Sequence, residues 1–293
     1  MEKIISPISK NLLSEEIAVI PSEDCYIQRG KFHVYIIQTH KAPNILKEIG
    51  RLREQTFREV GEGTGKALDL DEFDKYYYNL FIWDSEDQEI VGGYRVGAGD
   101  TIFKAYGING FYISSLFGIQ EPAYPILKKS LELGRSYIAK DYQKSYLPLF
   151  LLWQGILFFL LKRPHYRYLI GPVSISKYYS HTSKSMIVNF VKRHYFNEDI
   201  APYFQPRTPF APPLTLKNSL PNIGSELKDL EKFMATIEPA HIKVPILLKQ
   251  YTKLNARFIS FNLDPNFSDA LDGLMLLDLQ KIPEQVMRML KGR

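Results

Sequence analysis

Residues that cross-link a chain or bind a metal are scarce in this sequence. Cys25 is the single cysteine among 293 residues, so no disulfide can close within one chain and no zinc site can be built from cysteine. The six histidines show no close metal-ligand pairing. A disulfide framework and a cysteine-ligated metal centre are therefore excluded, and we predict no cofactor.

A membrane-spanning apolar run is also missing. The longest such stretch, residues 147–161 (LPLFLLWQGILFFLL), is interrupted by Gln154 and Gly155, and it is shorter than the roughly 20 residues that a spanning helix needs. The first residues lack the long apolar run and cleavage site of a signal peptide. We predict a cytoplasmic protein in which 147–161 is a buried core helix. The alternative is peripheral contact with the inner face of the membrane.

Several common catalytic and binding motifs are absent. The glycine-rich segment 61–67 (GEGTGKA) lacks the spacing of a phosphate-binding loop, because Val60 and Ala67 occupy the positions that need glycine and a hydroxyl residue. We interpret it as a helix stop followed by a mobile loop. No Gly-x-Ser-x-Gly nucleophile motif occurs. No known nucleic-acid-binding module occurs either, so we predict no nucleic-acid partner.

Charge is distributed unevenly along the chain. Residues 52–90 contain 11 acidic and 4 basic side chains, whereas residues 125–195 contain 12 basic and 2 acidic ones. A basic surface of this size would attract an acidic partner, such as a phosphate-bearing carrier or an anionic membrane. The alternative is that the two segments form ordinary solvated faces of opposite sign.

Hydrophobic patterning predicts alternating strands and helices. Strands are predicted at residues 33–39, 76–83, 89–96, 131–139, 166–174, 257–263 and 273–279. Helices are predicted at residues 44–62, 147–161, 178–194, 225–236 and 244–254. The polar turn after residue 83 predicts a hairpin between the second and third strands. This order favours an α/β (α+β) fold with a mixed central sheet flanked by helices.

Proline divides the chain. Five prolines fall between residues 202 and 213, and proline removes backbone donors, so we predict a connection without regular structure there. The organisation that we predict has four parts. These are an N-terminal extension (1–31), a core (32–200), the proline-rich connection (201–223) and a C-terminal part that completes the sheet (224–293).

Charged residues that could form a site are scattered over several predicted elements. They are Arg53, Asp71, Asp74, Arg95, Glu132 and Arg135, with Phe57 beside them. Arg53 and Phe57 are four residues apart, hence on one face of a helix. Glu132 and Arg135 share a strand, where they would point to opposite faces unless a bulge intervenes.

This ordered set resembles acyl-homoserine-lactone synthases. It is still more similar to the bacterial acyl-carrier-protein-dependent N-acyltransferases that make ornithine and glycine lipids, often labelled hemolysin-like. Four further parts of the chain carry the resemblance, which runs from about residue 32 to 279. They are LREQTFREVGEGTG (52–65), WDSEDQEIVGGYRV (83–96), LLWQGI with LIGPVSIS (151–156 and 169–176), and VPILLKQYTKLNARFISFNLDP (244–265).

The resemblance implies a GNAT-like fold and direct transfer of a long-chain acyl group from a carrier-protein thioester to the amine of an amino acid or amino-lipid. In such chemistry a backbone N–H on a splayed strand commonly stabilises the oxyanion. We hypothesise that Glu132 is the general base, acting through a water, with Arg135 in the same catalytic set. The resemblance implies that Arg53, Asp71, Asp74, Arg95 and Arg135 shape the acceptor pocket and its loop, and Phe57 is predicted in the same substrate-binding set. The alternative for Asp71, Asp74 and Arg95 is a structural ion-pair network, and Phe57 is expected to pack and not to take part in the chemistry.

The sequence departs from the family pattern at two points. Gly134 stands where the lactone synthases usually have serine, and the usual GNAT pyrophosphate-binding loop is not visible after strand 131–139. The second departure favours an acyl carrier protein over acyl-coenzyme A. The lysine-rich stretch 128–193 fits an acidic carrier.

Other functions stay open at this point. One is a membrane-active, hemolysin-like protein without turnover, and another is a binding module that keeps the fold. A third is a glycerolipid O-acyltransferase, because His194 and Asp199 have the His-x4-Asp spacing of that class. Ornithine, glycine and a lyso-lipid head group are all compatible acceptors.

Overall fold

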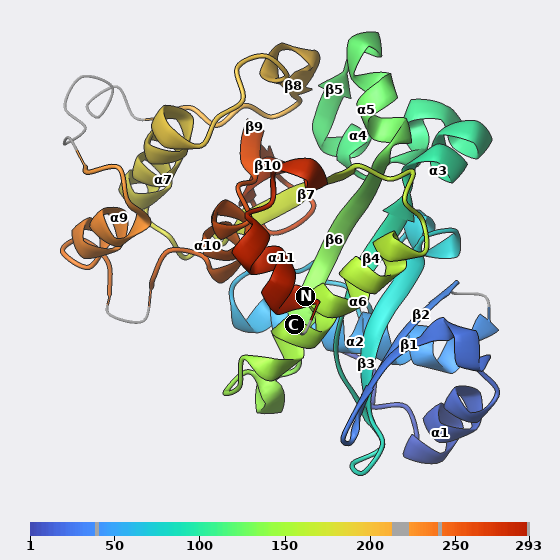
Figure 1. The fold of residues 1–293 in the computed structure, drawn as a ribbon. Coiled ribbons are helices and arrows are strands. Elements are labelled where there is room, and N and C mark those ends of the chain that lie inside the picture. Colours follow the sequence, from blue (N-terminus) through green and yellow to red (C-terminus); the bar gives the residue numbers. More distant parts are fainter. Residues whose placement is uncertain (39–40, 213–222, 240–241, 292–293) are drawn as a thin grey trace.

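A computed structural model describes residues 1–38, 41–212, 223–239 and 242–291. Within these residues, eight strands form one sheet in the order β1-β2-β3-β4-β6-β7-β10-β9 (Figure 1). Their bounds are β1 Cys25–Arg29, β2 Phe32–Gln38, β3 Tyr78–Asp84, β4 Glu89–Ala98, β6 Ser130–Ile138, β7 Tyr168–Ile175, β9 Arg257–Asp264 and β10 Ala270–Asp278. All neighbours are antiparallel except β6 and β7, so the sheet is mixed, as predicted.

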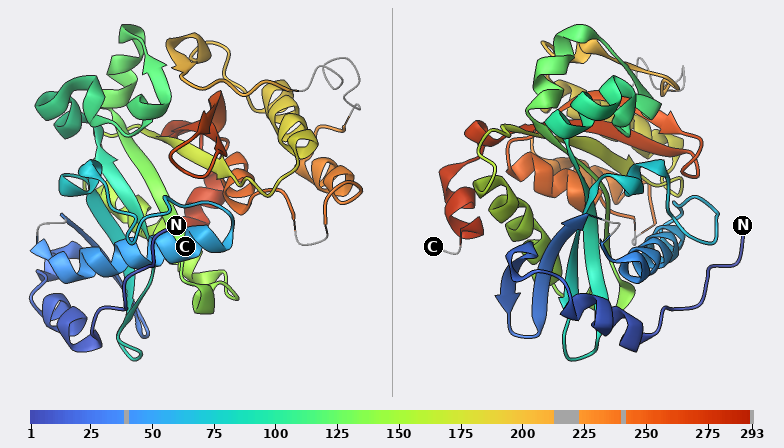
Figure 2. Two further views of the ribbon diagram at one scale, coloured as in Figure 1. Left: turned by 180° about the vertical axis from the view of Figure 1, so that it is seen from behind. Right: turned by 90° about the vertical axis from the view of Figure 1, so that its right-hand side faces the viewer.

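Helices cover both faces of this sheet. The longer ones are α1 Lys10–Ala18, α2 Pro43–Glu59, α3 Gly99–Tyr106, α6 Leu147–Leu161, α7 His181–His194, α9 Leu227–Met234 and α10 Ile246–Lys253. The shorter ones are α4 Ile113–Leu116, α5 Tyr124–Lys128 and α11 Glu284–Leu290. Figure 2 shows α2 and α6 on opposite faces.

Strand β3 explains this layering. Its side chains alternate between the faces. Leu80 and Ile82 lie in the same hydrophobic cluster as the apolar residues of α6, whereas Phe81 and Trp83 lie with those of α2. Because both faces are covered, the strand is apolar almost throughout, and the sequence shows a continuous aromatic and aliphatic run there.

The apolar stretch 147–161 forms helix α6, as predicted, and most of it is buried. Gly155 lets the helix approach the sheet closely, because a Cβ there would lie 2.9 Å from Val34 Cγ1 and 3.1 Å from Leu80 Cδ1. The Gln154 side chain donates a hydrogen bond to the Leu290 carbonyl of α11 at 2.9 Å, so the polar residue in the run is satisfied. Among the described helices, none has the length and apolarity required to cross a bilayer.

The proline-rich connection contains more order than the sequence predicts. Residues Phe204–Pro206 form a short strand, β8, that pairs with β5 (Phe117–Ile119). The prediction of no regular structure was therefore wrong for these residues. Proline is tolerated because β5 and β8 form a separate two-stranded sheet, with Pro206 at the end of its strand. Pro213 and residues 214–222 lie outside the described residues.

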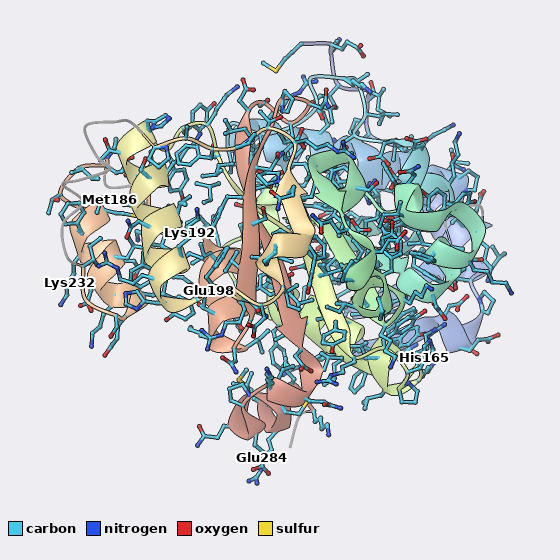
Figure 3. The ribbon with its side chains drawn as sticks, turned by 90° about the horizontal axis from the view of Figure 1, so that it is seen from above. His165, Met186, Lys192, Glu198, Lys232 and Glu284 are labelled. Atoms are coloured by element: carbon cyan, nitrogen blue, oxygen red, sulfur yellow. The ribbon has the colours of Figure 1, made fainter. Side chains whose placement is uncertain are left out.

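The C-terminal hairpin extends the main sheet. Strand β10 pairs with β7 along the whole of β7, from Leu271↔Ile175 to Asp278↔Tyr168, and with β9 on its other side. Helices α7 and α9 pack beside this end of the sheet. Seen from above, Met186 and Lys192 of α7 and Lys232 of α9 lie at the opposite end of the molecule from His165 (Figure 3).

The parallel pair β6 and β7 is paired at one end only. The ladder runs from Ser130↔Tyr168 to Glu132↔Ile170, and beyond it the two strands diverge (Figure 1). The backbones touch where they part, because a Cβ on Gly171 would lie 2.0 Å from the Leu133 carbonyl oxygen. Over most of their length, β6 and β7 are therefore not paired with each other.

A bulge interrupts β6 immediately after this point. Opposite β4, Arg95 pairs with Gly134 and Gly93 pairs with Tyr137, so β6 carries one extra residue there. Arg135 sits in the bulge at φ 52°. The bulge rotates the strand, and both Glu132 and Arg135 contact Tyr112. Without a bulge, Glu132 and Arg135 would point to opposite faces of the strand. The structure has such a bulge.

Candidate active site

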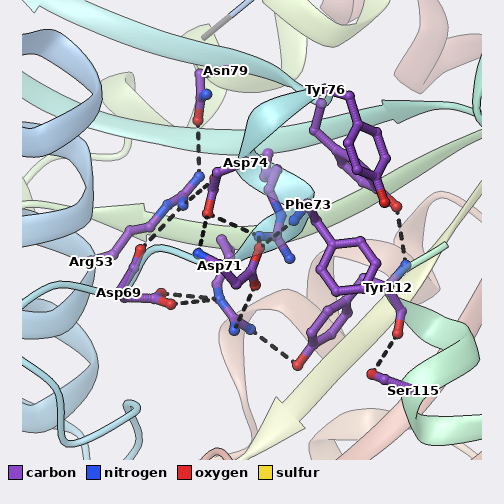
Figure 4. Close-up of polar contacts among 12 residues, drawn as sticks. Arg53, Asp69, Asp71, Phe73, Asp74, Tyr76, Asn79, Tyr112 and Ser115 are labelled. Carbon is purple, nitrogen blue, oxygen red and sulfur yellow. Dashed lines mark hydrogen bonds and ion pairs between the residues drawn. The ribbon is translucent and has the colours of Figure 1, made fainter. Parts of the chain in front are cut away.

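A buried network joins three of the expected site residues (Figure 4). Asp74 accepts a hydrogen bond from Arg53 Nη1 of α2 at 2.8 Å and one from Arg95 Nη1 of β4 at 3.2 Å. Arg53 Nη2 also donates to the Asn79 side-chain oxygen at 2.9 Å. The three charged side chains are at most 2% exposed. They come from three separate elements, so the network braces the helix, the sheet and the segment between them.

The short helix η3 (Glu72–Lys75) places the two aspartates. Asp71 caps this helix by accepting a hydrogen bond from the Phe73 N–H, and Asp74 accepts one from the Asp71 N–H, each at 3.0 Å. Asp71 also receives a hydrogen bond from Arg95 at 2.5 Å. The spacing Asp-x-x-Asp is thus that of a capping box. The Asp71 side chain accepts a hydrogen bond from a backbone N–H of the helix, and the Asp74 side chain accepts one from the backbone N–H of Asp71.

Charge compensation decides the protonation state of Asp74. Burial by itself would raise the pKa of this carboxyl, but the Arg53 and Arg95 guanidinium groups outweigh burial and hold the pKa below its usual range. Arg95 also lies against the rings of Phe73, Tyr77 and Tyr112, with its Cζ 5.2–5.6 Å from the centroids. Its Nη2 is buried and has no hydrogen-bond acceptor among the described residues.

Arg135 forms the second half of the site. Its Nε lies 3.0 Å from Asp69 Oδ2, its Nη2 lies 3.7 Å from Asp71 Oδ2, and its Nη1 donates to the Tyr112 hydroxyl at 3.2 Å. Tyr112 in turn donates to Asp264 of β9 at 3.0 Å. This chain of contacts connects β6 to the C-terminal hairpin.

Phe57 contacts this group only indirectly. It packs edge-on against Phe267 at 5.2 Å between ring centroids, and Phe267 lies 4.7 Å below the Arg135 guanidinium. Phe57 is 7% exposed and belongs to the core beneath α2. These are the contacts of a packing side chain, and its place in the substrate-binding set stays a prediction.

Glu132 is enclosed. Its carboxylate accepts hydrogen bonds from the Tyr77 hydroxyl, from the Ile113 N–H at 2.8 Å and from the Tyr112 N–H at 3.2 Å. It is 1% exposed. Burial raises the pKa of Glu132 to about 7, although the hydrogen bonds from Tyr77 and Ile113 oppose that shift. Glu132 thus anchors the segment before α4, and its role as a base stays a prediction.

Two further carboxyl groups lie within electrostatic range of Arg135. Asp272 of β10 accepts a hydrogen bond from the Ser174 hydroxyl of β7 at 2.6 Å. Burial raises the pKa of Asp272 to about 7, and the neighbouring Asp264 adds to the rise. Burial likewise raises the pKa of Glu62 to about 8. The site therefore holds several carboxyl groups that titrate near neutral pH, as acid–base chemistry requires.

His194 is not part of this site. Its ring packs against Phe190 at 4.9 Å, and its Nε2 is buried with no hydrogen-bond partner among the described residues. No hydrogen bond or ion pair joins His194 to Asp199 in the part of the chain that the structure describes. Across the same residues, no group of three or more His, Cys, Asp and Glu side chains is placed to hold a metal ion.

Several site residues escape sequence reasoning. They are Glu62, Asp69, Tyr77, Tyr112, Asp264 and Asp272. Asp69 could have been found, because it continues the acidic run to Asp71 and Asp74. Tyr112 and Asp264 lie 152 positions apart in the sequence, and nothing local marks either of them as polar partners in a site.

One part of the chain matches a known protein family. Residues 52–154 match the family model described as acetyltransferase (GNAT) domain. This part contains the C-terminal part of α2 together with η3, β3, β4 and β6, and these elements carry the Arg–Asp network and Glu132.

About two thirds of the chain is similar to two curated proteins named glycine N(alpha)-acyltransferase. It is 36% identical to the one from Phocaeicola vulgatus over 213 residues, which cover 68% of this chain and 64% of that protein. It is 35% identical to the one from Bacteroides thetaiotaomicron over 209 residues, covering 67% and 61%. The matched region spans less than two thirds of either relative.

Solved structures show a more distant likeness. A CoA-dependent acyl-homoserine lactone synthase, BjaI, solved with SAM and isopentyl-CoA, aligns with a TM-score of 0.45 at 12% identity, covering 89% of this chain and 88% of that one. The synthase LasI aligns with a TM-score of 0.36 at 17% identity, covering 55% and 78%.

Proposed function

We propose that this protein is an N-acyltransferase that moves a long-chain acyl group from a carrier-protein thioester to the amine of glycine. One observation carries the proposal. Arg135 is held in a bulge just beyond the point where β6 and β7 part, with Asp69, Asp71 and Tyr112 around it. A charged group so placed can orient a small zwitterion beside a thioester bound between the diverging strands.

The acceptor is the part of the proposal that the relatives favour. Glycine presents an ammonium group and a carboxylate. Guanidinium groups bind carboxylates in a bidentate fashion, and the site offers Arg135 and the unpaired Nη2 of Arg95. Ornithine, or a lipid that carries an amine, would need additional room for its longer side chain.

The donor that we propose is acyl carrier protein, with acyl-coenzyme A as the alternative. After β6 the chain enters a short 3-10 turn (Lys140–Tyr142), and α6 then begins with Leu147 and Pro148. This connection does not offer the glycine-rich N-terminus that would bind a pyrophosphate. The transfer itself needs an oxyanion donor, and backbone N–H groups of the diverging β6 are in the position to supply it.

Location and membrane contact belong to the same proposal. A cytoplasmic protein would meet acyl carrier protein directly, and its long-chain product would favour transient contact with the inner face of the membrane. Co-sedimentation with anionic vesicles, in the absence of substrates, tests the contact. Leakage of such vesicles would instead support the membrane-active alternative.

The test uses purified full-length protein. Long-chain acyl carrier protein or acyl-coenzyme A is mixed with glycine or ornithine, and free thiol and N-acyl product are measured. We expect glycine-dependent thiol release from the carrier protein. No release with any amine and either donor would overturn the proposal. A Glu132→Gln variant with full turnover would remove only the base assignment of Glu132.

A further inference from the structure

The turn that carries Glu62 is fixed to two distant parts of the chain. The Ser176 hydroxyl, just after β7, donates to the Val60 carbonyl, and the Ser268 hydroxyl of the β9–β10 turn donates to the Gly63 carbonyl at 3.1 Å. Gly61 lies so close to Tyr178 that a Cβ there would be 2.5 Å from the ring. Glu62 is therefore held beside the end of β7, where β7 has separated from β6.

Glycine on both sides makes this placement possible. Gly61 and Gly63 adopt φ 77° and 99°, which other residues adopt only with strain. The turn reverses the chain directly after α2. Glu62 is the one residue in it that carries a side chain between the two glycines, Gly61 and Gly63. The glycine-rich segment thus positions a carboxylate and does not bind a phosphate.

The Glu62 carboxylate is free to act. It makes no hydrogen bond or ion pair with any residue that the structure describes, and Glu62 is mostly covered but not fully closed off from solvent. Glu132, by contrast, is saturated by three donors and closed off from solvent. A base that must take a proton from an incoming amine needs an unoccupied oxygen that substrate can reach.

Charged groups from several elements face Glu62. Asp272 of β10 disfavours its negative charge, Arg135 of β6 favours it, and the Tyr179 hydroxyl lies within the range of its field. Burial and Asp272 together place its pKa at about 8. A carboxylate of this basicity accepts a proton near neutral pH far better than an ordinary glutamate does.

We propose that Glu62 is the general base of the acyl transfer, taking a proton from the acceptor ammonium at the open end of β6 and β7. The freed amine attacks the thioester carbonyl, the C–N bond forms, and the C–S bond breaks. The leaving thiolate takes the second proton of the nitrogen, and Glu62 returns the first to solvent. This inference rests on the proposed function. It assigns the role of general base to Glu62 in place of Glu132 and changes nothing else in that proposal.

Glu62→Gln tests the inference, with Glu59→Gln as the matched control. Glu59 is the last residue of α2, just before the turn that carries Glu62, and among the described residues its carboxylate pairs with exposed Lys140 at 3.5 Å. We expect kcat/KM for glycine to fall by on the order of 100-fold or more in Glu62→Gln and to stay unchanged in the control. Glu62→Asp should recover part of the activity.

A pH profile separates catalysis from structure. Wild-type kcat/KM should rise with pH through an inflection near 8, because the deprotonated carboxylate is the active form. The inflection should vanish in Glu62→Gln and move to lower pH in Asp272→Asn, which removes the neighbouring negative charge. The thermal midpoint of Glu62→Gln at pH 8.5 should not fall, because a carboxyl whose pKa is raised on folding costs stability above its unfolded pKa.

The outcomes are distinct. Wild-type protein without glycine-dependent thiol release overturns the proposed function and this inference together. Active wild-type protein with a Glu62→Gln variant of equal kcat/KM and the same pH profile overturns this inference alone. A variant that loses activity only in proportion to a lowered thermal midpoint also overturns it, because the residue is then structural.

Discussion

Asp74 is the residue on which the buried network depends, because it is shared by two guanidinium groups from different elements. Removing one partner of a buried ion pair leaves the other charge without compensation. This destabilises the fold more than replacing the whole pair with well-packed apolar residues would. The network therefore fixes the approach of α2 to β4 more strictly than apolar packing would.

Asp74→Asn should destabilise the protein by about 3 kcal/mol at pH 7, since Arg53 and Arg95 both lose their charged partner. The pKa of Asp74 is lowered on folding, so its contribution is present above the ordinary value of 3.8 and is lost as the pH falls below it. Denaturant unfolding at pH 7 and at pH 3 should show a smaller pH effect in the variant. The exposed Asp87→Asn serves as control, and equal stability of Asp74→Asn and wild type at pH 7 would contradict the prediction.

Arg135 combines an unfavourable backbone with a necessary side chain. At φ 52° an L-residue is strained by about 1 kcal/mol relative to glycine. Arg135→Gly should therefore be more stable than Arg135→Ala by about that amount, while both lose at least 10-fold in kcat/KM for glycine. Chemical denaturation and thiol-release kinetics measure the two effects. A more stable alanine variant would mean that the bulge is not strained.

At the scale of elements, the point where β6 and β7 part is set by one glycine. Gly171→Ala should destabilise the protein by about 2 kcal/mol or more, because the new methyl group meets the Leu133 carbonyl at 2.0 Å. Gly118→Ala in β5 is the control, since its nearest neighbours lie 3.8–4.0 Å away, and its effect should stay within about 0.5 kcal/mol. Urea unfolding of both variants checks this, and equal midpoints would contradict it.

The sequence predicts elements well where one periodicity dominates. The predicted strand at 76–83 and helix at 147–161 became β3 and α6 with bounds of Tyr78–Asp84 and Leu147–Leu161. Most of the elements it misses are short or lie at the chain ends, among them α1, β1, α4, α5 and α11, and the eight-residue helix α3 is missed as well. In α4 and α5 only four or five residues are helical, too few for a period to show.

The candidate site follows the same division. Two local signals point to part of the site: a charge within an apolar strand (Arg95) and the capping-box spacing of two aspartates (Asp71 and Asp74). The structure brings these three residues together. Glu62 and Tyr112 carry no such mark, because their importance arises only from long-range packing of the β9–β10 hairpin and the β7 end against them. A pattern of local spacing cannot contain that information.

For the whole molecule, the basic segment 125–195 does not form one patch. It runs from β6 through α6 and β7 to α7, and Lys192 and His165 lie at opposite ends (Figure 3). Only part of it can therefore meet a carrier protein at once. The part next to the open end of β7 begins with Lys177, which is exposed and follows Ser176.

We expect KM for acyl carrier protein to rise on the order of 10-fold between 50 and 300 mM salt, because exposed charge pairs are screened. Lys177→Glu should raise this KM at low salt, whereas Lys129→Glu, at the closed end of β6, should not. Steady-state thiol release gives both values. A salt-independent KM, or equal effects of the two variants, would argue against docking beside β7.

The position of β10 has a consequence for how the protein is made. Strand β7 has β6 beside it along only part of its length, and its other neighbour, β10, is synthesised only after residues 176–269. Until then the centre of the sheet is an unpaired edge, available to the wrong partner. A chain that stops anywhere between residues 176 and 269 would therefore leave β7 unpaired on this side and be prone to aggregate.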